Sequence, residues 1–131
     1  MIDTTDATRG ALGEYRDCSV LALANAAGVS YGAAHEALRK AGRKPRGGAY
    51  WAQVKVALIA LGCSYHEPLG RAWSCTGRST GYHTKNFDHA GIWLLSTPRH
   101  FTALIEGQLT DYIATAKRAR KITGAIQVIR P

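Results

Sequence analysis

Long apolar runs are missing from this chain of 131 residues. No stretch comes near the roughly 18 consecutive apolar residues that a membrane-spanning helix needs. The first ten residues, MIDTTDATRG, also lack the basic start and apolar centre of a secretory signal. We therefore expect a cytoplasmic protein with no membrane partner. No internal repeat is visible, and the length suits one domain over residues 1–131 with a core of its own.

Cysteine is scarce, and its count is odd. Cys18, Cys63 and Cys75 cannot all pair within one chain, and without an export signal an odd count favours reduced thiols. Cys63 and Cys75 lie near His66 and His83, which are ligand types for zinc, but the second pair lacks the short spacing of a zinc knuckle. We expect neither a structural metal nor a cofactor, so thiol chemistry stays available.

Acidic residues are few: 9 Asp and Glu stand against 17 Lys and Arg, which gives a formal net charge of +8. Such a charge attracts acidic peptides, nucleoproteins or nucleic acid. The basic residues gather in segments 39–46 and 117–121. Basic surfaces also arise as ordinary solvated faces, so the charge alone does not choose among these partners.

The first half of the sequence has the spacing of helices. Asp17 is a good N-cap for a helix that begins at residue 18 and stops at Gly28. Ser30 can cap a second helix that ends at Gly42, and apolar residues at three- and four-residue intervals predict a third helix within 50–62.

The second half has the composition of strands. Between Cys63 and His89 no periodicity is visible, and a segment of that length is more often functional than filler. Runs of β-branched and aromatic residues then predict four strands, at 91–96, 100–106, 108–113 and 122–129. The expected fold class is α+β, with N-terminal helices packed on one face of a C-terminal antiparallel β-sheet.

Cys18 lies where a thiol can become reactive. The predicted helix start places Cys18 in the first turn, where unpaired backbone amides stabilise a thiolate. A thiolate nucleophile needs a base, usually a histidine, and a group that orients the base. Taken on its own, Cys18 is better explained as a small buried hydrophobe, because cysteine is among the most buried residue types.

The predicted hairpin supplies both further groups. Its turn at Glu106 and Gly107 sets the opposed pairs: Ile105 with Gln108, Leu104 with Leu109, and Thr102 with Asp111. His100 and Thr102 share a face because strand side chains alternate. His100 and Asp111 are then diagonal neighbours, roughly 7–8 Å apart, which an imidazole and a carboxylate can bridge. Either residue alone could be purely structural.

Two segments resemble the papain-like cysteine peptidases, in particular the minimal bacteriocin-leader peptidase branch and small phage-encoded relatives. They are DCSVLALANAAGVSYGAAHEAL near the N-terminus and GIWLLSTPRHFTALIEGQLTD downstream. The order Cys, His, Asp is also the family order. The resemblance implies a papain-like fold in which Cys18 is the nucleophile, His100 the general base and Asp111 the residue that orients it, with a peptide or protein as substrate.

One family feature has no counterpart here. The family places a glutamine shortly before the cysteine, where its amide helps to form the oxyanion hole, but the only glutamines are Gln53, Gln108 and Gln127. Losing one such donor costs on the order of 100- to 1000-fold in turnover. Either another group such as Tyr15 or a threonine of the N-terminal segment substitutes, or the activity is weak or absent.

Three functions therefore remain open from the sequence. The first is a thiol hydrolase, most often a peptidase, although a deamidase or acyltransferase would use the same residues. The second is a papain-fold binding protein without the reaction, such as a viral or mobile-element inhibitor of host machinery. The third is a basic nucleic-acid-binding module, whose affinity would fall steeply with salt.

Overall fold

The computed structural model describes residues 18–44, 49–67, 91–97, 100–109 and 122–131, with the backbone alone at positions 97, 100, 108 and 109. Three helices lie in these residues: α2 (Cys18–Ala27), α3 (Tyr31–Lys40) and α4 (Trp51–Ala60). Among the described residues, no helix has the length and apolar character needed to span a membrane.

The helix boundaries follow the capping signals in the sequence. The Ser30 hydroxyl accepts a hydrogen bond from the Ala33 amide at 3.1 Å, as an N-cap should. Gly28, Gly42 and Gly62 each follow a helix with a positive φ, at +72°, +110° and +83°, a conformation that L-residues with a side chain rarely adopt. All three predicted helices are thereby confirmed.

The described strands form one antiparallel sheet in the order β1-β5-β2-β3-β4. Their bounds are β1 (Ser64–His66), β2 (Ile92–Thr97), β3 (His100–Ile105), β4 (Gln108–Leu109) and β5 (Gly124–Ile129). The α+β class is confirmed, and so is the antiparallel sheet. The sequence showed no periodicity after Cys63, and this interpretation was wrong for β1. A three-residue strand is too short to show alternation and is defined only by its pairing with β5.

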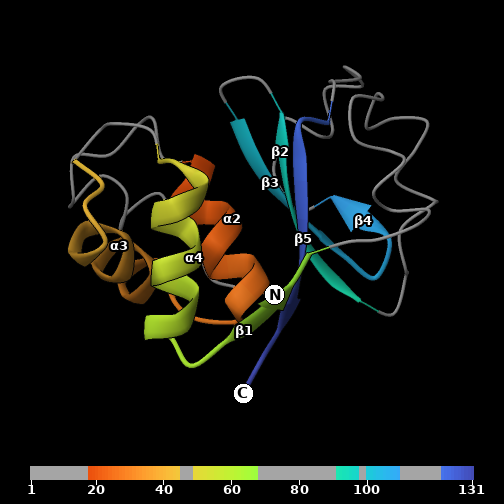
Figure 1. The fold of residues 1–131 in the computed structure, drawn as a ribbon. Helices are drawn as coiled ribbons and strands as arrows, with labels where there is room; N and C mark the ends of the chain where they lie inside the picture. Colours follow the sequence, from red (N-terminus) through yellow and green to blue (C-terminus); the bar gives the residue numbers. More distant parts are fainter. Residues whose placement is uncertain (1–17, 45–48, 68–90, 98–99, 110–121) are drawn as a thin grey trace.

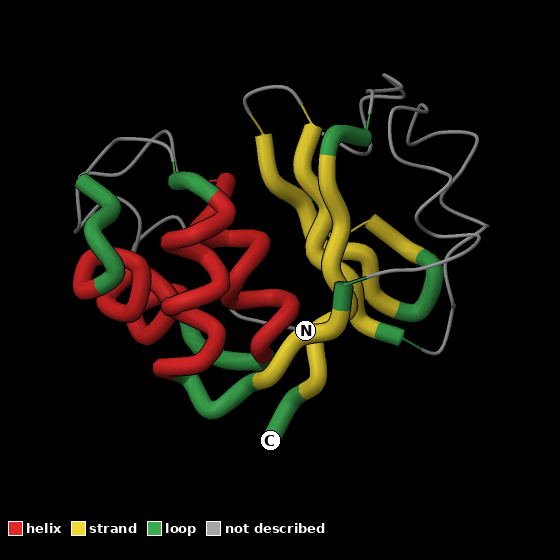
Figure 2. Tube along the Cα trace, viewed as in Figure 1, coloured by secondary structure: helices red, strands yellow, loops and turns green. Residues whose placement is uncertain are grey.

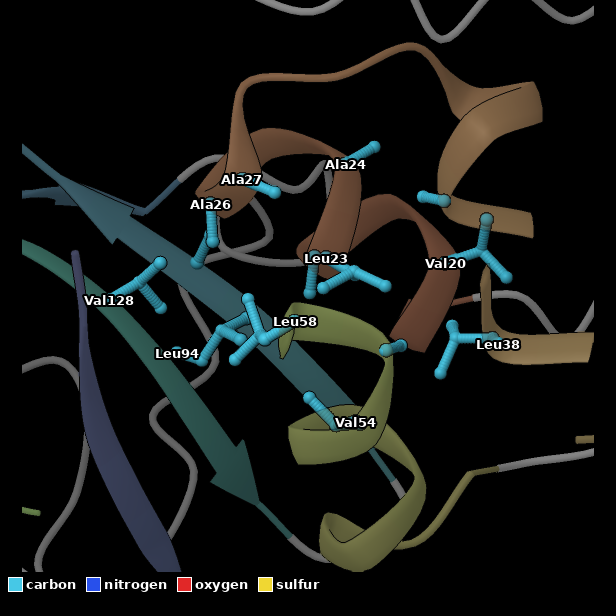
Figure 3. Close-up of a cluster of buried hydrophobic side chains, with 14 of the residues drawn as sticks. Val20, Leu23, Ala24, Ala26, Ala27, Leu38, Val54, Leu58, Leu94 and Val128 are labelled. Carbon is cyan, nitrogen blue, oxygen red and sulfur yellow. The ribbon is translucent and has the colours of Figure 1, made fainter. Parts of the chain in front are cut away.

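The three helices lie on one face of the sheet (Figures 1 and 2). Side chains of α2 meet alternate residues of β2, β3 and β5 in the main core, and α3 packs against α2 and α4. Leu94 and Val128 there face Leu23, Val54 and Leu58 (Figure 3). The other face also carries buried side chains: Trp93, Leu95, Leu104, Ile122 and Ala125. The sheet is therefore buried on both faces, and its ends and loops are where function can be exposed.

Candidate active site

The two cysteines that the structure describes have different environments. Cys18 is the first residue of α2 and is half-buried, whereas Ser19 and Val20 beside it are buried. Cys63 follows α4, is 3% exposed, and belongs to the main core. Burial raises the pKa of the Cys63 thiol, although the charge of Arg130 acts in the opposite direction. Cys63 is thus the small buried hydrophobe, and Cys18 is the thiol at a helix tip.

The direction of α2 places its start at a definite end of the sheet. Arg130, directly after β5, donates hydrogen bonds to carbonyls of the last turn of α2, so the helix ends where β5 ends. The register pairs Val128 with Ile92, and Ile92 with Ile105, so β5 and β3 end on the same side. In consequence α2 and β3 also begin at the same end, with Cys18 and His100 as their first residues (Figure 1).

Position 100 has a defined place in the register. It pairs with Thr97 in the last rung before the β2–β3 connection. Phe101 and Ala103 belong to the core beneath the helices, and Leu104 belongs to the cluster on the other face. By alternation, position 100 has the same parity as Thr102 and Leu104, as the sequence predicts. Cys18 and position 100 therefore lie at the same end of the sheet, but position 100 has the parity of the face that the helices do not cover. A contact between the thiol and the imidazole stays a prediction.

The β3–β4 hairpin has the predicted register. Leu104 pairs with Leu109 and Ile105 with Gln108. Asp111 lies outside the described residues, so its position opposite Thr102 stays a prediction. The Thr102 side chain is buried, and its hydroxyl has no hydrogen-bond partner among the described residues.

The indole of Trp51 lies at the same end of the sheet. Trp51 is the first residue of α4, and its Nε1 donates a hydrogen bond to the Ser96 hydroxyl at 3.0 Å. The Ser96 and Thr123 hydroxyls are 2.9 Å apart and hydrogen-bonded. The Trp51 ring meets Phe101 edge to face, with centroids 5.0 Å apart. Such contacts between residues far apart in the sequence leave no local signal that a pattern could reveal.

Two glutamines have side chains that the structure describes, Gln53 and Gln127, and both lie away from the start of α2 in the sequence and are placed by other elements. Gln53 caps α4, because its side-chain oxygen accepts a hydrogen bond from the Tyr50 amide at 3.0 Å. Gln127 lies in β5, opposite both His66 and Trp93. Tyr15, the proposed substitute, lies outside the described residues.

The ligand types that suggested zinc do not form a centre within the described residues. His66 is exposed in β1, whereas Cys63 is buried, and Cys75 and His83 lie outside the description. No group of three or more His, Cys, Asp or Glu side chains within the described ranges is arranged to hold a metal ion.

Comparison with known proteins adds no relative: no family model, curated protein or solved structure matches the chain.

Proposed function

We propose that the protein is a thiol hydrolase, most readily a cysteine peptidase. One observation carries the proposal: the helix that begins with Cys18 and the strand that begins with His100 start at the same end of the sheet. The fold thus brings the starts of two elements, 82 positions apart in the sequence, to one end of the sheet, and cysteine and histidine are the residue types of the nucleophile–base pair in thiol enzymes.

The proposed reaction has two halves. The Cys18 thiolate adds to the substrate carbonyl carbon, and the bond to the leaving group breaks as protonated His100 gives that group its proton. A thioester on Cys18 remains. His100 then takes a proton from water, the resulting hydroxide attacks the thioester, and the acid product leaves with the thiolate restored. Asp111 orients the His100 ring in this scheme.

The environment of Cys18 supports its role as the nucleophile. The amides of the first helical turn stabilise a negative charge, and Cys18 is only half-buried. The formal charge of +8 favours acidic peptide or protein substrates, including nucleoproteins. Peptide hydrolysis, deamidation and acyl transfer share the same first step, and the groove walls that select among them are set by other residues.

The nucleic-acid alternative receives less support from the described part of the basic segment 39–46. Arg39 forms an ion pair with Glu36 at 2.6 Å on α3, and Arg43 is 3% exposed. An arginine that is paired or buried contributes little to phosphate binding unless the surface rearranges. Lys40 and Lys44 remain exposed there.

Alkylation of the cysteines by iodoacetamide at pH 6 to 9, resolved by site with mass spectrometry, tests the proposal without a known substrate. At pH 6 Cys18 should react far faster than glutathione, an accessible thiol with an ordinary pKa, and His100→Ala should abolish that advantage. His66→Ala is the matched control. His66 is exposed on the edge strand β1, which β5 and β2 separate from β3, so its replacement should leave the alkylation rate of Cys18 unchanged at every pH.

A second measurement follows the acyl-enzyme itself. Incubation with p-nitrophenyl acetate should release nitrophenolate and add one acetyl group to Cys18, and neither should occur in Cys18→Ala. If Cys18 instead reacts like an ordinary thiol with a pKa of about 8.5, and His100→Ala changes nothing, the binding-protein reading replaces the enzyme.

A further inference from the structure

Trp51 joins three strand ends at the end of the sheet where α2 begins. Its Nε1 donates to Ser96, the next-to-last residue of β2, and its ring packs against Phe101, the second residue of β3. Ser96 in turn bonds Thr123, just before β5, through the two hydroxyls and through the Thr123 amide, which donates to the Ser96 carbonyl at 2.8 Å. One side chain thus ties α4 to β2, β3 and the approach to β5.

Gly124 makes this contact possible. A Cβ at position 124 would lie 2.6 Å from Trp51 Nε1 and 2.8 Å from Ser96 Oγ, distances that real Cβ atoms do not adopt. The indole therefore lies directly against the backbone at the start of β5. Such close approach of a ring to a backbone is a recurrent reason for glycine within a strand.

The tied strand ends include the position of the proposed base. Ser96 pairs with Phe101, and the next rung outward pairs Thr97 with His100. The Trp51 contacts are therefore made on the rung that adjoins His100. Because α4 and α2 pack together in one core, the Trp51 contact also fixes the β2–β3 end relative to the helices.

We infer that Trp51 is a positioning residue. Through its hydrogen bond to Ser96 and its contact with Phe101, it keeps the His100 end of β3 at a fixed position relative to the start of α2. This inference rests on the proposed thiol–imidazole pair. Trp51 itself does not touch reacting atoms in this scheme. Its role is to keep the pair at a constant separation while substrate enters and product leaves.

The test uses Trp51→Phe, which keeps a ring and removes the Nε1 donor, and Ser96→Ala, which removes the acceptor. Each should lower the alkylation rate of Cys18 at pH 6 on the order of fivefold, the effect of one lost hydrogen bond, and shift its pH profile toward that of an ordinary thiol. The double variant should lose little more than either single one, because both remove the same contact.

Trp93→Phe is the matched control. Trp93 lies on β2 as well, is 4% exposed, and belongs to the cluster on the opposite face of the sheet. Its replacement should leave the Cys18 pH profile unchanged. Cys63 provides an internal control within every sample, because its alkylation rises if the core loosens as a whole.

The outcomes separate this inference from the proposed function. If His100→Ala leaves the pH profile of Cys18 alkylation unchanged, the proposed thiol–imidazole pair is wrong. If His100→Ala acts but Trp51→Phe and Ser96→Ala match the wild type, the positioning role is overturned and the proposed function stands. The role is equally overturned if Trp93→Phe shifts the profile as much as Trp51→Phe, or if Cys63 becomes reactive in parallel with the loss at Cys18.

Discussion

Arg130 caps α2 from a position 104 residues further along the chain: its Nε donates to the Ala26 carbonyl at 3.0 Å, and a terminal guanidinium nitrogen donates to the Asn25 carbonyl at 2.9 Å. The last carbonyls of a helix have no partner within it, and a cation there also complements the helix dipole. At this helix the Gly28 and Val29 amides both bond to the Ala24 carbonyl. Arg130 therefore satisfies the next two carbonyls.

Arg130→Ala should lower the free energy of unfolding by about 1–2 kcal/mol, because two charge-assisted hydrogen bonds at a partly buried helix end are lost. Arg130→Lys should fall between, since an ammonium lacks the planar fork that reaches both carbonyls. Urea denaturation measures both. Arg39→Ala is the control: its ion pair with Glu36 is half-exposed and should contribute less than about 0.5 kcal/mol. Equal losses at positions 39 and 130 would contradict the capping role.

Gly28→Ala should destabilise the protein by about 1–2 kcal/mol, because φ is +72° at this position and a side chain pays a steric penalty there. The new Cβ would also lie 3.0 Å from Arg130 Cζ and disturb the cap. Gly32→Ala offers the opposite case. Position 32 lies inside α3 with nothing within 4 Å of its Cβ, so alanine should stabilise the protein by up to about 1 kcal/mol. Thermal unfolding of the two variants should shift in opposite directions.

Glu106→Asn should stabilise the β3–β4 hairpin. Glu106 and Gly107 both have positive φ, 52° and 78°, as a type I′ turn requires, and Asn-Gly is the preferred pair for that turn. The gain should be about 0.5–1 kcal/mol in urea denaturation. Gly107→Ala should lose a similar amount. A neutral or destabilising Glu106→Asn would mean that the glutamate makes a contact beyond the turn.

Stability should fall at alkaline pH through Cys63. Burial raises the pKa of this thiol in the folded state, so between the unfolded value of about 8.5 and the folded value only the unfolded chain loses the proton. The contribution of the neutral thiol to the free energy of unfolding is fully present below the unfolded-state pKa and is lost as the pH rises toward the folded-state pKa. Between pH 7 and 10, the free energy of unfolding measured by urea denaturation should fall more steeply for the wild type than for Cys63→Ala. Parallel curves would rule out this linkage.

Local signals predicted the parts of the fold that are local. Ser30 predicted the start of α3, and Gly28 predicted the end of α2. Glu106 and Gly107 predicted the turn and register of the hairpin. These signals are local because capping and turn formation depend on neighbouring backbone geometry. The position of Cys18 at a helix start followed from the same signals.

Features set by distant contacts were not predictable in this way. Strand β1 has three residues and exists through its pairing with β5. The bond between Trp51 and Ser96 joins residues 45 positions apart, and the periodicity of α4 assigned Trp51 to the core without indicating its partner. Whether Cys18 and His100 share an end of the sheet likewise depends on the direction of α2, which Arg130 reveals and no repeat pattern encodes.

The sheet order gives β5 a particular importance during synthesis. Strand β5 separates β1 from β2, so the ribosome must translate past residue 124 before these two earlier strands can be joined. Until then a nascent chain has open edges on both β1 and β2, which are surfaces prone to pairing with other chains. A pause in translation after β2 and before β5 should therefore raise the need for chaperones more than a pause within α2, α3 or α4.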